Sequence, residues 1–307
     1  MPELRPLAFT LLALGAAGAP LAQEPDFDKV EVSTTKVAEG VFMFVGAGGN
    51  IGVSAGGDGV FLIDDQYAPL TPKIKAAVAA ISDKPIRFVL NTHWHGDHTG
   101  GNKDLGEAGV LIVAQDNVRV RMSTEQFIEA FKRKVAASPE KALPVITYDS
   151  TVTFHLNGDE IQASHVSPAH TDGDSVVHFK KANVIHAGDL FFNGLYPFID
   201  LGSGGSFTGV IAAADRMLGM ADEKTRIIPG HGPLGDRAAL KEYREMLVSV
   251  RGKIEPLVRA GKTLAEVQAA KPTADWDAKW GKGFLKPEMF TEIVYTSLSR
   301  EAKPAKK

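Results

Sequence analysis

The stretch that decides the fold is "NTHWHGDHTGGN", residues 91–102, which holds three histidines and one aspartate in the spacing H-x-H-x-D-H. The whole chain has only nine histidines in 307 residues, so three within one short segment favour a metal site over a solvated loop. In an extended segment, residues i and i+2 point the same way, so His93 and His95 can bind one metal ion. A turn after His95 would then direct Asp97 and His98 toward a second ion.

Three later segments supply the further ligands that such a site needs. Each is an apolar, strand-like run that ends in a turn and carries one side chain able to bind metal. They are "HVSPAHTDGD" with His170, "NVIHAGD" with Asp189 and "TRIIPGHG" with His231. Strand ends can converge at one edge of a sandwich, where polar side chains meet on a rigid frame. Imidazole and carboxylate ligands suit Zn²⁺, and Fe or Mn can replace it where a carboxylate bridges two ions.

This order of motifs resembles the metallo-β-lactamase superfamily over nearly the whole chain beyond its N-terminal segment. The resemblance implies a four-layer αββα sandwich, of the α/β (α+β) class, with two zinc ions at one edge. The ligand set that it implies is His93, His95 and His170 for the first metal, Asp97, His98 and His231 for the second, and Asp189 as the bridge between them. Capping of a helix is the alternative role for Asp189.

Other polar residues have weaker signals. Asp64 and Asp65 follow an apolar strand, and the resemblance makes them candidates for the acid that hydrogen-bonds a ligating histidine; a plain turn is the equal alternative. The remaining histidines lie inside strands without matching motif context and are expected to be structural or exposed: His155, His165, His178 and His186.

The ligand set predicts metal-assisted hydrolysis. Two ions about 3.5–4 Å apart can hold a water and lower its pKa to about 7, which gives a hydroxide that attacks a carbonyl group. Asp97 would orient this nucleophile and handle its proton. Tyr196 and Asn193 follow Asp189 closely and are candidate donors to the oxyanion. The chain has no cysteine and no G-x-S-x-G motif, so a protein nucleophile of either kind is not expected.

The substrate class remains open between two hydrolytic alternatives. By resemblance, the family cleaves β-lactams, thioesters, lactones and phosphodiesters. By resemblance, an aspartate at position 189 is the pattern of glyoxalase-II-like thioesterases, lactonases and phosphodiesterases, whereas many periplasmic β-lactamases carry Cys or Ser there. Export favours a β-lactamase-like hydrolase of a β-lactam or related cyclic amide or ester. A non-catalytic diiron protein is the remote alternative.

Composition and the N-terminus bear on location and partners. The chain is 44% apolar and 23% charged with a net charge of -3, which fits a soluble globular protein with a small-molecule substrate and argues against a nucleic-acid partner. Residues 1–22 combine one basic residue, an apolar run and small residues, which predicts a signal peptide and a periplasmic or secreted protein. The run is too short to span a membrane. Residues 23–307 are predicted to form one domain with a helical C-terminal region.

The apolar patterns also predict individual elements. Strands are expected in the ligand-bearing segments and in a glycine-rich meander over residues 41–64, with a hairpin turn at residues 157–158. Helices are expected at residues 71–81, 123–135, 207–220, 238–260 and 287–300. Residues 46–50 are interpreted as a hairpin tip over the site or a plain turn, residues 123–144 as a lid, and residues 202–206 as a flexible loop.

Overall fold

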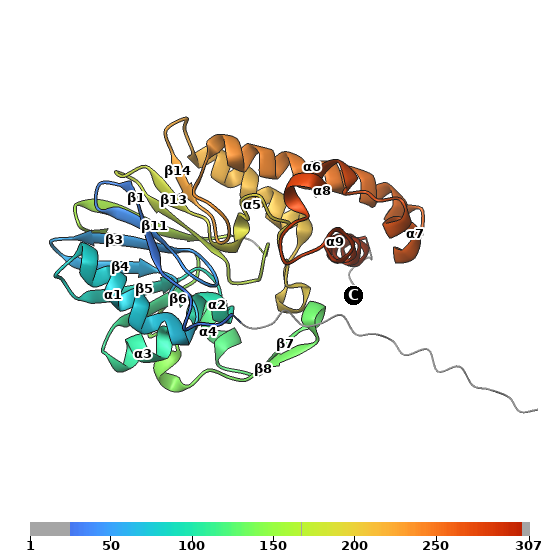
Figure 1. The fold of residues 1–307 in the computed structure, drawn as a ribbon. Coiled ribbons are helices and arrows are strands. Elements are labelled where there is room, and N and C mark those ends of the chain that lie inside the picture. Colours follow the sequence, from blue (N-terminus) through green and yellow to red (C-terminus); the bar gives the residue numbers. More distant parts are fainter. Residues whose placement is uncertain (1–24, 167, 303–307) are drawn as a thin grey trace, which may run out of the picture.

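Two β-sheets lie face to face and helices cover their outer faces, as the ribbon of the computed structural model shows (Figure 1). The structure describes residues 25–166 and 168–302, so the predicted signal peptide lies outside the described residues. The first sheet has seven strands in the order β1-β2-β3-β4-β5-β6-β9, and the second has six in the order β10-β11-β12-β13-β14-β15. The predicted αββα layering is confirmed.

The strands of each sheet follow one another along the chain. Those of the first sheet are β1 (Ser33–Ala38), β2 (Val41–Val45), β3 (Ile51–Gly56), β4 (Gly59–Ile63), β5 (Ile86–Asn91), β6 (Leu111–Gln115) and β9 (Ile146–Tyr148). Those of the second are β10 (Thr151–Leu156), β11 (Asp159–His165), β12 (Ser175–Phe179), β13 (Val184–His186), β14 (Arg226–Ile228) and β15 (Gly235–Asp236). The β4–β5, β5–β6 and β13–β14 pairs are parallel, so the carboxyl ends within each pair meet at the same edge.

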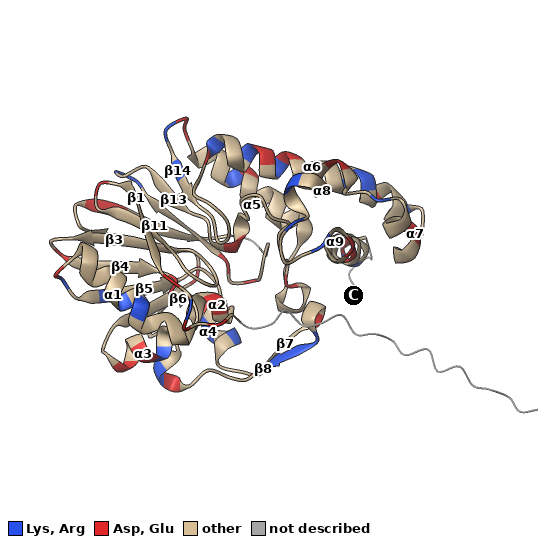
Figure 2. Ribbon diagram, viewed as in Figure 1, with Lys and Arg blue, Asp and Glu red and all other residues tan. Residues whose placement is uncertain are grey.

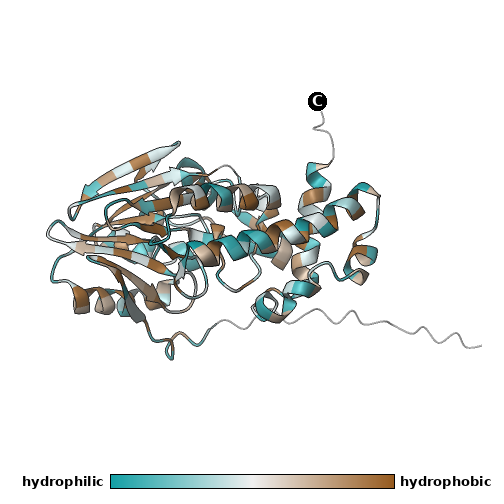
Figure 3. Ribbon diagram, turned by 90° about the horizontal axis from the view of Figure 1, so that it is seen from above, coloured by the Kyte–Doolittle hydropathy of each residue, from teal (hydrophilic) through white to brown (hydrophobic). Residues whose placement is uncertain are grey.

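The core between the sheets explains why the strands read as apolar runs. Phe61, Leu90 and Val113 of the first sheet pack in one cluster with Val177 and Phe179 of the second. Strands that are buried on both faces have few polar residues. Seen from above, the long helices alternate hydrophobic and hydrophilic residues (Figure 3).

Four predicted helices are confirmed: α1 (Thr71–Ile81), α5 (Phe207–Met220), α6 (Arg237–Arg259) and α9 (Pro287–Glu301). Each long helix buries one face, α1 against the first sheet and the other three around the second sheet. The short helices were not predicted because one or two turns give no periodic signal: α2 (Gly96–Thr99), α3 (Asn102–Glu107), α4 (Asp116–Met122), α7 (Leu264–Ala269) and α8 (Ala274–Trp280). Within residues 25–166 and 168–302, no helix has the length and apolar character that crossing a membrane requires.

The helix predicted at residues 123–135 is wrong. The segment forms a small hairpin of β7 (Gln126–Ile128) and β8 (Arg133–Val135), joined by a 3-10 helix and a left-handed Lys132. A helix would have aligned Phe127 with the apolar residues four and eight positions later, but Phe127 is half exposed while Ile128 enters the core. Tertiary contacts therefore override the helical spacing. Figure 2 shows the basic residues that line β8.

Two predictions about turns have different outcomes. The β10–β11 hairpin turns at Asn157 and Gly158, both with positive φ, as an Asn-Gly turn requires. Residues 202–206 are more regular than expected. Their first part belongs to a 3-10 helix, Leu201–Ser203, and Ser206 caps α5 by accepting from the Gly209 N–H.

Candidate metal centre

The ends of strands in both sheets bring the predicted ligands to one edge of the sandwich. β5 leads directly into His93, His95 and α2, which carries Asp97 and His98. The ligands of the second sheet follow β11, β13 and β14, and they are His170, Asp189 and His231. All seven predicted ligands lie in two adjacent groups, within each of which the potential metal-binding atoms lie no more than 4.8 Å apart.

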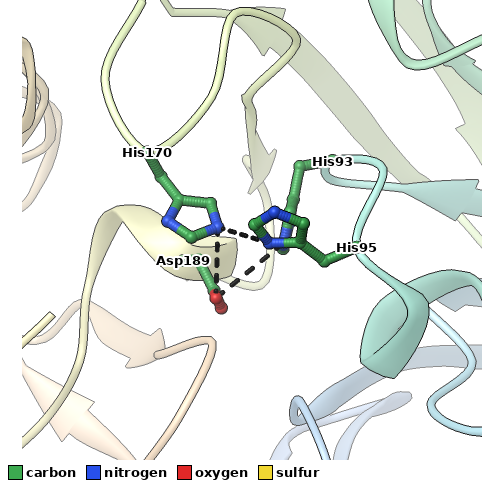
Figure 4. Close-up of side chains that lie close together, drawn as sticks. All are labelled: His93, His95, His170 and Asp189. Atoms are coloured by element: carbon green, nitrogen blue, oxygen red, sulfur yellow. Dashed lines mark hydrogen bonds and ion pairs between the residues drawn. The ribbon is translucent and has the colours of Figure 1, made fainter. Parts of the chain in front are cut away.

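The first group consists of His93, His95, His170 and Asp189, all buried (Figure 4). His95 Nδ1 lies 3.1 Å from His93 Nε2 and 2.9 Å from His170 Nε2. Asp189 Oδ2 lies 3.4 Å from His170 Nε2 and 3.8 Å from His93 Nε2. Three imidazole nitrogens and one carboxylate oxygen that converge in this way form a ligand set suited to zinc.

The second group consists of Asp97, His98 and His231 and is less deeply buried. Asp97 Oδ2 lies 3.3 Å from His231 Nε2 and 3.7 Å from His98 Nε2. The side chains of His231 and Asp97 are 19% and 22% exposed, whereas His98 is fully buried. The open side of the centre is therefore at the second group.

Asp189 connects the two groups through its two oxygens. Its Oδ2 faces the first group, while its Oδ1 lies 3.1 Å from His98 Nε2 and 3.5 Å from His231 Nε2. Asp189 Oδ1 and His98 Nε2 are buried and make no hydrogen bond. Among the described residues, their only close polar neighbours are each other and the other members of the two groups, and metal ions would satisfy both atoms. The residues present thus fit the dinuclear centre that the sequence predicts, with Asp189 placed as its bridge.

The charge state of the centre also suits cations. Burial lowers the pKa of His170 to about 4, and it lowers the pKa of His93 well below the usual value, which keeps both rings neutral as metal ligands. Burial would lower the pKa of His231 as well, but the carboxylates of Asp189 and Asp97 raise it to about 9. These carboxylates therefore favour positive charge in the second group, where a metal ion would supply it in place of protons.

The ring nitrogens that face away from the centre have partners of their own. Asp64 Oδ2 lies 2.8 Å from His98 Nδ1 and accepts the hydroxyl hydrogen of Thr92, whose oxygen lies 3.1 Å from His93 Nδ1. Asp64 is thus placed to orient His98, one of the predicted ligands, and Asp65 accepts the Gly101 N–H instead.

Two further partners hold the remaining histidines of the first group. His170 Nδ1 donates to the Phe198 carbonyl at 2.8 Å, and His95 Nε2 lies 3.0 Å from Asp200 Oδ2. Asp200 is not among the residues predicted from the sequence. Its only signal is its position in "FIDLGSGGS", a polar turn soon after Asp189, and nothing in that turn points to His95.

The two predicted oxyanion donors are placed differently from the ligands. The structure corrects the prediction that Tyr196 donates to the oxyanion. Its ring is buried against Phe290, and its hydroxyl donates to Asp277 at 2.8 Å in the helical region, so the hydroxyl is not available to a substrate. Asn193 lies beside the turn of His231, where its backbone N–H donates to the His231 carbonyl and its amide to the Pro233 carbonyl. The role of Asn193 toward a substrate stays a prediction.

The hairpin tip at residues 46–50 is hydrogen-bonded to the loops that carry the candidate ligands. Its Gly49 N–H donates to the Asp97 carbonyl, and the amide of Asn50 donates to the carbonyls of Pro229 and Gly232. A Cβ atom on Gly49 would lie 2.1 Å from the ring of His98, so only glycine fits there. The tip therefore binds the loops of both second-group histidines together.

Comparison with known proteins assigns the family. A model of the Metallo-beta-lactamase superfamily matches residues 45–231, which is more than half of the chain. The chain therefore belongs to this superfamily.

Solved structures share the fold at low identity. The metallo-beta-lactamase from Pontibacter korlensis superposes with a TM-score of 0.59 at 19% identity and covers 71% of this chain and 99% of its own. DIM-1 metallo-beta-lactamase superposes with a TM-score of 0.58 at 20% identity over 72% of this chain and 99% of its own. At these identities the likeness concerns the fold alone.

Several curated relatives are named hydroxyacylglutathione hydrolase rather than metallo-beta-lactamase. The hydroxyacylglutathione hydrolase of Pelagibacter ubique is 27% identical over 163 residues, which are 51% of this chain and 57% of the relative. That of Gloeobacter violaceus is 24% identical over 255 residues, which are 75% of this chain and 90% of the relative. This chain therefore spans little more than half of the first relative and most of the second.

Proposed function

We propose that the protein hydrolyses a β-lactam or a related cyclic amide or ester at a dinuclear zinc centre. The observation that carries the proposal is the division of the two Asp189 oxygens between two histidine groups. Two bound zinc ions would supply a nucleophile from water at neutral pH and polarise the carbonyl group under attack.

The chain contributes the geometry of this reaction. Three buried histidines would hold the first ion rigidly, each fixed by a partner on its outer nitrogen. Asp97 lies at the open side, where burial raises its pKa but the neighbouring His98 and His231 lower it further, so the carboxylate stays ionised. It would accept a hydrogen bond from the attacking water and receive its proton.

A thioesterase is the second candidate, and two observations favour it. Several curated relatives are named hydroxyacylglutathione hydrolases, and position 189 carries the aspartate typical of glyoxalase-II-like enzymes. The same metal centre would serve a thioester or a lactone, because the attacked group is again a carbonyl.

The location is also a proposal. Residues 1–22 have the pattern of a signal peptide, which would place the mature protein in the periplasm or outside the cell. Hydrolysis of β-lactams there would protect a cell against these antibiotics, and this is why we place the β-lactam first.

The test is hydrolysis by the purified, zinc-loaded chain that begins at residue 23. A chromogenic cephalosporin, an acyl thioester and a lactone are compared, with Asp97→Ala as the control for reaction at the centre. Cephalosporin turnover that the variant loses supports the proposal. Thioester turnover without cephalosporin or lactone turnover replaces it with the second candidate.

A further inference from the structure

His95 is turned the opposite way from the other histidines of its group. His93 and His170 present Nε2 to the centre and bond outward through Nδ1. His95 presents Nδ1, which lies 2.9 and 3.1 Å from the other two Nε2 atoms, and bonds outward through Nε2. A neutral imidazole binds metal only through its unprotonated nitrogen, so His95 must carry its proton on Nε2.

Asp200 is placed to hold that proton. Its Oδ2 lies 3.0 Å from His95 Nε2, and its side chain is buried, so no bulk water competes for the bond. An ionised carboxylate is only an acceptor, so the contact requires the proton to be on His95. The tautomer that exposes Nδ1 to the first metal follows.

Asp200 is itself fixed by its own turn. Its Oδ1 accepts the backbone N–H groups of Gly202 and Ser203, and its Oδ2 accepts the Ser203 hydroxyl at 2.7 Å. The Ser203 oxygen in turn accepts from Trp94 Nε1 at 3.1 Å. Trp94 precedes His95 in the chain, so two successive residues of the metal-binding loop are tied to one turn.

We infer that Asp200 is a positioning residue that selects Nδ1 of His95 as a ligand of the first metal, and that Ser203 and Trp94 hold Asp200 in place. The inference rests on the proposed metal centre but needs no particular substrate. The turn is also held from outside, since Arg300 of α9 donates to the Leu201 carbonyl and pairs with Glu129. The C-terminal helix thus supports a metal ligand that it does not touch.

The experiment measures zinc binding to the mature chain rather than turnover. The stepwise dissociation constants are determined by competition with a chromophoric chelator for wild type, Asp200→Asn, Asp200→Ala and Asp236→Asn. Asp236 is the matched control because its carboxylate also caps a helix, by accepting the Ala239 N–H at 2.9 Å, but it meets no histidine. Partners of this kind are worth about 10–100-fold in metal affinity, so the Asp200 variants should weaken one of the two zinc constants by that factor and Asp236→Asn neither.

A second readout separates positioning from general stability. In a long-range ¹H–¹⁵N spectrum of the zinc-loaded wild type, His95 should be protonated on Nε2, and the Asp200 variants should lose this pattern. Variants that are less stable to urea but keep both zinc constants and the His95 signals would overturn the inference. If the Asp200 variants do not fold, Ser203→Ala against the helix-cap control Ser206→Ala repeats the comparison, with a smaller loss expected only for Ser203→Ala.

The outcomes also separate this inference from the proposed function. A wild-type protein that binds two zinc ions and cleaves no lactam, thioester or lactone defeats the proposed function and leaves the role of Asp200 standing. A wild-type protein that binds no zinc overturns both.

Discussion

The two metal groups share Asp189 but differ in how they are enclosed. The first group is buried, and each of its histidines has a partner on the outer nitrogen: Thr92, Asp200 or the Phe198 carbonyl. The second group has one buried histidine, held by Asp64, and two side chains that reach the surface in part. If the proposed metal centre forms, the first group would retain its metal ion more firmly, and the second would lie on the side open to water and substrate.

The largest effect is expected where the two groups join. Asp189→Ala removes an oxygen from each group and should lower the affinity for both ions. Hydrolysis should fall about a thousandfold or more, since losing metal catalysis costs several kcal/mol of transition-state stabilisation. Metal content and turnover are the measurements, and Asp215→Asn, an exposed ion-pair change, is the control. A variant that keeps two tightly bound ions would refute the bridging position of Asp189.

His231→Ala should separate the two groups. It removes one ligand from the partly exposed group only, so the purified variant should retain about one equivalent of zinc, with turnover reduced roughly a hundredfold, or about 3 kcal/mol. Elemental analysis after dialysis against a weak chelator measures this. If both ions are lost together, the groups act as one unit and the proposed difference between them is wrong.

A milder change acts on the partner of the second group. Asp64→Asn keeps the shape of the side chain but removes the negative charge beside His98. The backbone at this position has φ 66°, a conformation that asparagine tolerates. The affinity for one zinc ion should fall about 10–100-fold. Asp65→Asn is the neighbouring control: burial raises the pKa of Asp65 well above its usual value, and its carboxylate accepts the Gly101 N–H rather than a bond from a histidine ring. Equal losses in both variants would show that the effect is not specific to His98.

The smallest effect is expected on the pH dependence of stability, and it involves the loop of the buried first group. Asp174 lies in the loop that carries His170, where burial raises its pKa to about 7 although Thr171 hydrogen-bonds to it. Between the unfolded pKa of about 4 and this value, the folded chain holds a proton that the unfolded chain has released, so this group makes stability fall as pH rises.

Urea unfolding of the metal-free protein at pH 5 and pH 8 tests that sign. The free energy of unfolding of wild type should decrease from pH 5 to pH 8 relative to that of Asp174→Asn, which cannot titrate. The same pH dependence in both proteins would rule out this role of Asp174.

The sequence was informative where a ligand follows directly on a strand. His93, His95, Asp97 and His98 continue β5, and the later ligands follow their own strands, so local pattern and spatial convergence agree. Asp200 could not be found in this way, because its contact with His95 joins residues 105 positions apart through a turn.

The errors arise where nearness in sequence is not nearness in space. Tyr196 is only seven residues after Asp189 in the sequence, but its ring stacks on Phe290 in the helical region. In residues 123–135 the apolar spacing suits a helix, yet burial of Ile128 and the left-handed Lys132 produce a hairpin. In both cases long-range packing decided the outcome.

The fastening of residues 46–50 determines where new specificities can be engineered. A side chain at Gly49 would collide with His98, and changes at Asn50 would release the loops on either side, so mutational libraries there would mostly yield damaged centres. The β7–β8 hairpin carries no ligand and exposes Phe127, while its neighbour Phe131 meets the centre through Phe198. Directed evolution of substrate range would therefore start at exposed positions of this hairpin such as Phe127, and would leave Ile128 in the core and the Glu129–Arg300 pair unchanged.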